Sequence, residues 1–223
     1  MSPQTARPST SSLDARLREE MCRTGASLFE RGLTHGSTGN ISVAHPDGGW
    51  LMTPTGSSLG ALDPARLSRL DAGGRLTGGD APTKEAFLHT TMYARRSKAR
   101  AVVHLHSTHS VAVSCLDGID PANVLPPITA YYVMRIGALP LVPYYPPGDE
   151  ALAAAVGVLA GTHHAVLLAN HGPVVAGTSL SAATDAIEEL EETARLYLML
   201  QGRPIRPLDG LQMAELRRRF PAG

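Results

Sequence analysis

Hydrophobic residues recur along the chain with the two periods that distinguish helices from strands. A spacing of three or four residues predicts an amphipathic helix over residues 13–33 and a long helix that begins after Thr178 or Ser179 and ends at Gly202. Further helices are predicted over residues 80–96, 107–116 and 149–159. Short apolar runs predict strands over residues 41–44, 50–53, 101–106, 139–144, 165–169 and 173–176.

Two of these helices begin with residues that are typical of helix starts. Asp80 is expected to cap the helix at 80–96, with Pro82 in the first turn, where its missing N–H costs nothing. Ser107 is expected to cap the following helix in the same way. These caps place the predicted helix boundaries.

Helices and strands alternate irregularly, and short turns join two pairs of strands. Residues 47–49, with the sequence Asp-Gly-Gly, separate the first two strands, and His171-Gly172 separates the last two. Such hairpins do not occur in a regular doubly wound parallel sheet. We therefore predict a single-domain α/β/α sandwich with a mixed, largely antiparallel central sheet covered by helices.

The two ends of the chain differ from its middle. Residues 1–12 are polar and lack the apolar core of a signal peptide, so we expect a flexible tail there. Residues 13–202 form the predicted domain, and residues 203–223 a surface extension that ends in a short helix. The apolar stretch at 151–160 is shorter than the roughly 20 residues needed to span a bilayer. A cytoplasmic protein is expected.

Charge and cysteine content narrow the classes of partner. Lysine and arginine total 20, as do aspartate and glutamate, so no basic excess suggests nucleic acid or an anionic membrane as a partner. Cys22 and Cys115 lie far apart without a CxxC spacing. Two reduced thiols are expected, rather than a disulfide or a cysteine zinc site.

Three histidines and one glutamate are the candidate chemistry. His104 and His106 alternate on a predicted strand, which puts both imidazoles on one face. His171 lies in the last hairpin turn, and Glu85 lies near a helix start, where the dipole favours a negative charge. Three neutral imidazoles with an open fourth position are typical of a catalytic zinc. Taken singly, each residue has an ordinary structural interpretation, and that interpretation is preferred for His89.

Three polar loop segments are candidates for binding a phosphate. They are Gly39-Asn40, Thr55-Gly56 and Thr83-Lys84. Each offers backbone N–H groups freed by glycine or by a helix start, together with a hydroxyl, amide or ammonium group. Taken alone, each is also an ordinary turn, because glycine, serine and asparagine dominate turns.

The order of these motifs resembles the class II aldolase/adducin family. The resemblance covers roughly residues 13–200 and is carried by Gly39-Asn40-Ile41-Ser42, Thr53-Pro54-Thr55-Gly56, Pro82-Thr83-Lys84-Glu85, His104-Leu105-His106 and Asn170-His171-Gly172. It implies a class II aldolase-like fold and a homotetramer with active sites at subunit interfaces.

The resemblance also implies roles for the candidate residues. One zinc ion per subunit would be held by His104, His106 and His171, with Mn²⁺ or Co²⁺ as substitutes. Glu85 would be a ligand in the resting enzyme and an acid/base in turnover. The three loop segments would bind the phosphate of a small sugar or sugar-acid substrate. A tyrosine from the neighbouring chain would donate a proton, and Tyr131 or Tyr132 matches that place.

One departure from the family pattern suggests a branch. Aldolases of this family tend to have two serines before the glutamate, whereas this chain has Thr83-Lys84. This lysine and the Tyr-Tyr-Val-Met stretch at 131–134 look most like the 3-oxo-tetronate 4-phosphate decarboxylases. That branch implies decarboxylation to dihydroxyacetone phosphate and CO₂ through a metal-stabilised enediolate. The alternatives are a fuculose-phosphate-type aldolase, a dehydratase of a methylthio-sugar phosphate, and a non-catalytic adducin-like interaction domain.

Overall fold

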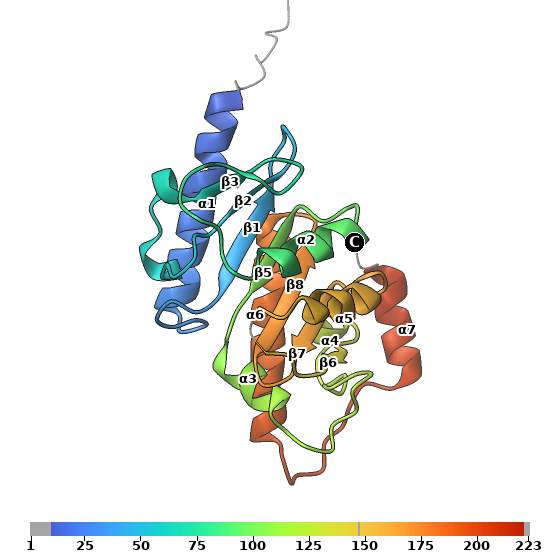
Figure 1. The fold of residues 1–223 in the computed structure, drawn as a ribbon. Coiled ribbons are helices and arrows are strands. Elements are labelled where there is room, and N and C mark those ends of the chain that lie inside the picture. The colour runs from blue at the N-terminus through green and yellow to red at the C-terminus, as the bar shows by residue number, and fades with distance from the viewer. Residues whose placement is uncertain (1–9, 147, 221–223) are drawn as a thin grey trace, which may run out of the picture.

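A mixed sheet runs through the protein in the computed structural model, which describes residues 10–146 and 148–220 (Figure 1). Within these residues it has eight strands in the order β4-β3-β2-β1-β5-β8-β7-β6. All neighbours are antiparallel except β6 and β7, which are parallel. The strands are β1 (Asn40–Ala44), β2 (Trp50–Met52), β3 (Ser68–Leu70), β4 (Leu76–Gly78), β5 (Ala101–His104), β6 (Leu141–Val142), β7 (Ala165–Leu168) and β8 (Gly172–Gly177).

Helices cover both faces of this sheet, with α2 and α5 on one side and α6 on the other (Figure 1). Two short 3₁₀ helices, η1 (Leu59–Ala61) and η2 (Pro64–Arg66), precede β3. The described α-helices are α1 (Thr10–Glu30), α2 (Ala86–Arg95), α3 (Thr108–Ser114), α4 (Ala130–Arg135), α5 (Glu150–Ala160), α6 (Leu180–Met199) and α7 (Gly210–Arg219). The predicted fold class is confirmed, and so are the hairpins β1–β2 and β7–β8.

The alternation of side chains along the central strands creates two cores. In β5, Ala101 and Val103 join the core beneath α1 and α6, whereas Val102 joins the core beneath α2 and α5. His104 therefore points toward the α2 side, because successive strand residues face opposite ways. In the adjacent β1, Ile41 packs in the core on the α6 side. Asn40 and Ser42, the residues before and after it, therefore face α2, as His104 does.

The predicted helix start at Asp80 is wrong. The helix begins at Ala86, with Glu85 at the N-cap. The Asp80 carboxylate accepts a hydrogen bond from Arg66 Nε at 2.7 Å, so it does not cap a helix. Pro82 forms an isolated antiparallel bridge with Pro54. This pairing with a distant loop keeps the chain extended before α2.

Other predicted boundaries also differ from those in the structure. The strand predicted at 101–106 ends at His104, and the strand predicted at 139–144 shortens to Leu141–Val142. The short helix α4 was not predicted, nor were the strands β3 and β4. β4 is exposed along its length at the edge of the sheet, so its side chains carry no apolar alternation.

The ends of the chain are only partly described. Helix α1 begins at Thr10, and residues 1–9 of the predicted flexible tail lie outside the described residues. In the predicted extension, α7 packs against α4, and the backbone N–H of Leu208 donates to the carbonyl of Pro127 at 2.9 Å. The division at residues 12 and 202 stays a prediction. None of the helices in the described ranges is long and apolar enough to cross a membrane. Cys22 and Cys115 are free thiols.

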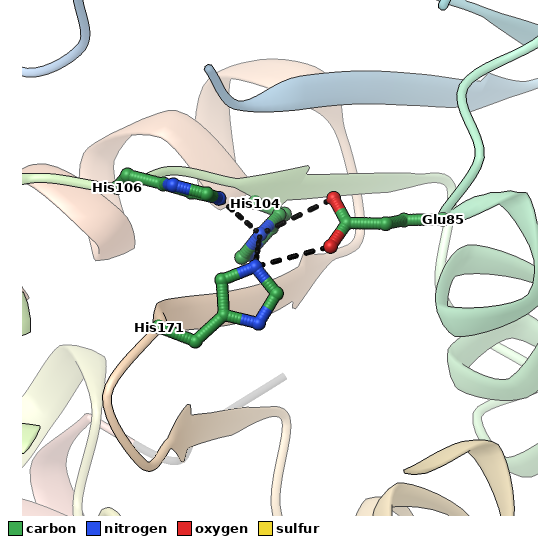
Figure 2. A group of neighbouring side chains, drawn as sticks. All are labelled: Glu85, His104, His106 and His171. Atoms are coloured by element: carbon green, nitrogen blue, oxygen red, sulfur yellow. Dashed lines mark hydrogen bonds and ion pairs between the residues drawn. The ribbon is translucent and has the colours of Figure 1, made fainter. Parts of the chain in front are cut away.

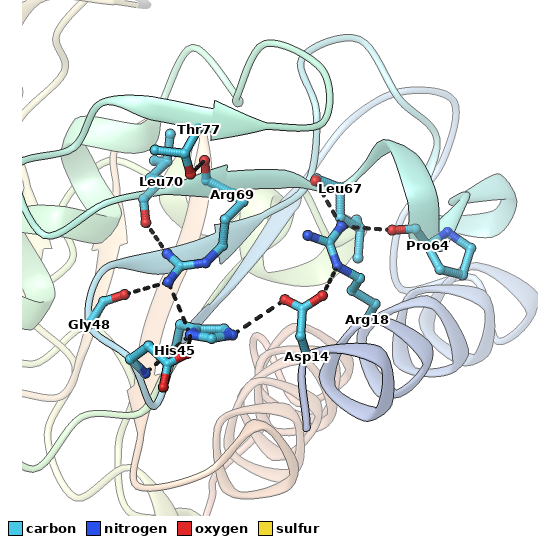
Figure 3. A network of polar contacts seen from close by, with 10 residues as sticks. Asp14, Arg18, His45, Gly48, Pro64, Leu67, Arg69, Leu70 and Thr77 are labelled. Carbon is cyan, nitrogen blue, oxygen red and sulfur yellow. Dashed lines mark hydrogen bonds and ion pairs between the residues drawn. The ribbon is translucent and has the colours of Figure 1, made fainter. Parts of the chain in front are cut away.

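A polar network fastens α1 to the β1–β2–β3 edge of the sheet (Figure 3). His45 Nδ1 accepts a hydrogen bond from Arg69 at 3.0 Å, because a guanidinium can only donate. The imidazole proton is therefore on Nε2, which faces Asp14 Oδ1 at 3.3 Å. Asp14 also accepts from Arg18 Nε at 2.6 Å, and Arg18 donates to the carbonyl of Leu67 at 3.1 Å. Burial and the nearby guanidinium lower the pKa of His45.

The start of α3 is capped from another helix. Ser107 stands at the N-cap, as predicted, but its side chain makes no capping hydrogen bond. Glu191 of α6 instead accepts the backbone N–H groups of His109 and Ser110, each at 2.8 Å. Burial alone would raise the pKa of Glu191, but these bonds outweigh it and hold the pKa below its usual range. The carboxylate fixes the segment that follows His106.

We expect Glu191→Gln to lower the free energy of unfolding by about 1–2 kcal/mol at pH 7, the usual scale for a hydrogen bond to a charged group. The pKa is lower in the folded state, so the carboxylate stabilises fully above its unfolded pKa of about 4.3. That contribution is lost as the pH falls through the folded pKa. Thermal unfolding at pH 7 and pH 3.5 would measure the difference. Glu192→Gln is the control, because Glu192 is exposed and its one ion pair among the described residues is with Arg195 at 3.5 Å. An equal loss for Glu191→Gln at both pH values would contradict the expectation.

Candidate metal centre

Four side chains from three separate segments point toward one small volume (Figure 2). His104 is the last residue of β5, His106 follows it, His171 lies in the β7–β8 turn and Glu85 precedes α2. His104 Nε2 lies 3.1 Å from His106 Nε2 and 3.3 Å from His171 Nε2. The Glu85 carboxylate lies 3.1 Å from His171 Nε2 through Oε1 and 3.5 Å from His104 Nε2 through Oε2. The structure thus brings the four predicted residues together.

These distances fit a divalent metal ion. Zinc bonds to imidazole nitrogen are about 2.0–2.1 Å long, so a tetrahedral site separates its donor atoms by roughly 3.3 Å. His104 Nδ1 lies 2.8 Å from the carbonyl of Pro173, which can only accept, so Nδ1 carries the proton. The lone pair of His104 is therefore on Nε2, which faces the other three groups. Glu85, His104, His106 and His171 can hold a metal ion.

Burial sets the protonation states that metal ligands need. It lowers the pKa of His104, and burial together with the neighbouring imidazoles lowers the pKa of His106 to about 3. Burial would raise the pKa of Glu85, but His104, His171 and Asn40 outweigh it and hold that pKa well below its usual range. At neutral pH the carboxylate is ionised and the imidazoles of His104 and His106 are neutral. Metal binding therefore requires no proton release from these three groups.

Glycine allows the turn that carries His171 to approach the His-X-His segment. A Cβ atom on Gly172 would lie 2.3 Å from the carbonyl oxygen of Leu105, and its φ of +149° is also unfavourable for other residues. Asn170 adopts a φ of 55°, which asparagine tolerates better than most side chains. Its backbone N–H donates to the carbonyl of Ser114 at 3.3 Å, which anchors the turn to α3.

The three predicted phosphate loops lie side by side next to this cluster. Thr53 connects them, because its N–H donates to the carbonyl of Ile41 at 3.0 Å and its carbonyl accepts from the N–H of Thr83 at 3.1 Å. Of the predicted phosphate contacts, Thr55, Gly56 and Lys84 are exposed. Gly39 has a positive φ and lies close to the carbonyl of His104.

The side chains of Asn40 and Thr83 are already engaged. Asn40 Nδ2 donates to Glu85 Oε2 at 2.7 Å, and Thr83 Oγ1 accepts the backbone N–H of Glu85 at 3.3 Å. Both side chains are buried. They hold Glu85 in place here, and their predicted role as phosphate ligands stays a prediction.

The sequence favours an ordinary helix-face role for His89. In the structure it is completely buried, and its Nε2 lies 2.5 Å from Asn40 Oδ1. The available signal was its spacing: His89 follows Glu85 by four residues, which brings the two side chains to the same side at the start of α2. That spacing does not reveal that Asn40 of β1 is the hydrogen-bond partner of His89.

The two candidate tyrosines are placed differently. Tyr132 is 0% exposed, and its hydroxyl donates to Asn123 Oδ1 at 3.3 Å within the same chain. Its phenol packs in the core beside α6 and is not exposed at the surface of this chain. Tyr131 is 58% exposed on α4 and remains the candidate of the pair.

Comparison with known proteins places this site in a family. The family model described as the class II aldolase and adducin N-terminal domain matches residues 19–198. The chain belongs to the class II aldolase and adducin family. The resemblance predicted from the ordered motifs is thereby confirmed.

Relatives within the family differ in their similarity to this chain. The 3-oxo-tetronate 4-phosphate decarboxylase of Escherichia coli K12 is 54% identical over 201 residues, which cover 90% of this chain and 95% of the relative. The L-fuculose phosphate aldolase of the same strain is 32% identical over 185 residues, which cover 82% of this chain and 83% of the relative. The crystal structure of YgbL from Escherichia coli superposes with a TM-score of 0.90 at 52% identity, covering 92% of this chain and 99% of YgbL.

Gly172→Ala should weaken metal binding at least tenfold, the lower end of what disturbing a ligand's support usually costs. The new Cβ would collide with the Leu105 carbonyl and push His171 away from its partners. A competition titration with a coloured chelator would measure the affinity. Gly202→Ala is the matched control, because Gly202 has a φ of +73° but a Cβ atom there would meet no neighbour within 4 Å. It should cost about 1–2 kcal/mol of stability and leave metal affinity unchanged. Equal affinities for the two variants would show that the close approach is unimportant.

Proposed function

We propose that this protein is a zinc-dependent 3-oxo-tetronate 4-phosphate decarboxylase that yields dihydroxyacetone phosphate and CO₂. The proposal rests on the decarboxylase of Escherichia coli K12, which is 54% identical to this protein over 90% of the chain. In this chain the four side chains that could hold a metal ion lie together. The aldolase relative is more distant, at 32% identity.

Zinc is the proposed metal because neutral imidazoles suit it and the donor spacing matches its bond lengths. Mn²⁺ and Co²⁺ are proposed as substitutes. A zinc ion bound here would supply Lewis-acid chemistry, drawing electrons from a substrate carbonyl oxygen. His104, His106, His171 and Glu85 would hold it.

The reaction needs an electron sink and a proton. When the bond between C1 and C2 of the substrate breaks, CO₂ leaves and the electron pair delocalises over C2 and the 3-oxo oxygen. C2 then takes up a proton, which is the only other change needed to form dihydroxyacetone phosphate. Glu85 is the carboxylate among the four metal-binding side chains and is the proposed acid/base group. Because it is ionised at neutral pH, it must first take up a proton from water before it can deliver one to C2. Its Oε2 already accepts from Asn40, so we assign this proton to Oε1.

The substrate has two anionic ends, and the exposed loop groups suit them. The exposed hydroxyl of Thr55 and the N–H of Gly56 are proposed to bind the phosphate, as glycine-containing loops commonly do. The N–H of Thr55 is already engaged, because it donates to the carbonyl of Ala81 at 3.0 Å. Lys84 adds a positive charge beside Glu85. Only two lysines occur in the whole chain, Lys84 and Lys98, against 18 arginines. A compact ammonium at this one place would serve a small carboxylate as a point charge.

The assembly is proposed from the family resemblance. A homotetramer with active sites between subunits would allow Tyr131 of one chain to donate a proton in the site of its neighbour. The exposure of Tyr131 supports this role, and we propose a cytoplasmic location for the assembly.

Zinc-loaded protein should release CO₂ and dihydroxyacetone phosphate in equal amounts from 3-oxo-tetronate 4-phosphate. The measurement is CO₂ evolution together with an enzymatic assay of the triose phosphate. His104→Ala and chelator-treated protein control for spontaneous decarboxylation, and both should fall to the uncatalysed rate. A higher kcat/KM for aldehyde release from L-fuculose 1-phosphate would favour the aldolase instead. Protein that binds no metal and turns over neither substrate would support an adducin-like interaction domain.

Lys84→Ser should reduce kcat/KM for the sugar acid by roughly tenfold or more, the scale of a charge-assisted contact worth about 1.5–3 kcal/mol. A neutral sugar phosphate, which lacks the carboxylate, should lose less. Lys98→Ser is the matched control, because Lys98 is exposed before β5, at the opposite end of that strand from His104. Equal losses on both substrates would contradict the assignment of Lys84 to the carboxylate.

A further inference from the structure

A buried line of polar side chains runs behind Glu85, away from the metal ligands. Asn40 joins Glu85 to His89, through the contacts of 2.7 Å and 2.5 Å described above. Beyond it, His89 Nδ1 lies 2.7 Å from Ser42 Oγ, and Ser42 Oγ lies 3.0 Å from the hydroxyl of Tyr93. All of these contacts lie in the layer between β1 and α2.

The direction of each hydrogen bond follows from the chemistry of its ends. An ionised Glu85 can only accept, so Asn40 must turn its NH₂ toward it and its carbonyl oxygen toward His89. A carbonyl oxygen can only accept, so His89 Nε2 must carry a proton. Burial lowers the pKa of His89 to about 3, so the ring is neutral and has a single N–H. His89 Nδ1 must therefore accept from the Ser42 hydroxyl.

We propose that His89 is a positioning residue that fixes the orientation of the Asn40 amide and, through it, the Glu85 carboxylate. The two ends of an amide have nearly the same shape, so packing alone does not decide which one faces Glu85. The Glu85 carboxylate and the His89 N–H select the same orientation from opposite sides, because a flipped amide would set N–H against N–H on one side and oxygen against oxygen on the other. The inference rests on the proposed function for the role of Glu85.

This fixation has a consequence at the metal site. Asn40 occupies Oε2, and Oε1 is left facing His171 at 3.1 Å. The two carboxylate oxygens are therefore distinct before any metal or substrate binds. The amide in the middle of the line also means that no proton can pass along it without an unfavourable imidic acid. His89 positions Glu85 and does not supply protons to it.

The tautomer of His89 is the first test. Zinc-loaded protein with ¹⁵N-labelled histidine should give a His89 ring spectrum with Nε2 protonated and Nδ1 bare, identified by its absence in His89→Gln. A His89 ring protonated at Nδ1, or at both nitrogens, would overturn the proposal. This measurement needs no substrate.

Variants at position 89 test the effect on the site. His89→Leu removes the donor and should weaken zinc binding and lower kcat, each at least tenfold. His89→Gln keeps an N–H that can reach Asn40 and should recover both values to within a few fold. Tyr93→Phe is the matched control, because it removes only the hydroxyl at the far end of the line. Melting temperatures accompany each variant, and similar losses for Leu and Gln at similar melting temperatures would overturn the proposal.

Ser42→Ala keeps the test decisive if His89→Leu does not fold. Without the Ser42 hydroxyl, Nδ1 loses its donor, while the Asn40 carbonyl oxygen still requires a proton on Nε2. Nε2 should therefore stay protonated, and zinc affinity should fall by no more than a few fold. A shift of the proton to Nδ1 with unchanged zinc affinity would overturn the proposal. If wild-type protein fails to decarboxylate the substrate while the tautomer and zinc results hold, the proposed function fails and the positioning role stands.

Discussion

Several electron-rich atoms converge on one point in this protein, and a cation between them would remove their mutual repulsion. The nitrogens of His104, His106 and His171 lie 3.1–3.3 Å from a neighbour in the cluster. Additional protons could also reduce the repulsion, but burial lowers the pKa of His104 and of His106 and so disfavours their charged forms. The rest of the structure keeps these groups in place despite the repulsion. A bound divalent ion would replace the repulsion between these lone pairs by attraction to the ion, and this change would favour metal binding.

Three of the four candidate ligands are each held by a different kind of support. His104 is fixed by the Pro173 carbonyl on the adjacent strand, so its ring orientation belongs to the sheet. His171 depends on backbone geometry at the neighbouring glycine, where no side chain could fit. Glu85 stands at the N-cap of α2 and is held by the Asn40 amide. Because these supports come from the sheet, a turn and a helix, the site requires the complete fold.

The parts of this site that were predictable from sequence are those fixed by local geometry. The His-X-His spacing predicted two imidazoles on one face, and the hairpin turn at His171 was visible from its glycine. Convergence with Glu85 came from resemblance, because no local rule brings a helix start to the end of a distant strand. The incorrect start at Asp80 has the same origin. Its partner Arg66 and the bridge between Pro54 and Pro82 are contacts over 14 and 28 residues, which periodicity does not detect.

The pairing of β1 with β5 determines which chemistry the α2 side of the sheet can hold. The register sets Asn40 opposite His104 and Ser42 opposite Val102, so the polar side chains of β1 lie against α2. A slip of one residue would turn these side chains to the other face and bring Ile41 toward Glu85. The apolar alternation of β1 prevents this slip, because Ile41 and Val43 are buried in the opposite core. The hydrophobic pattern that specifies the fold therefore also specifies the polar support of Glu85, and a substitution in β1 can alter the metal centre without touching a ligand.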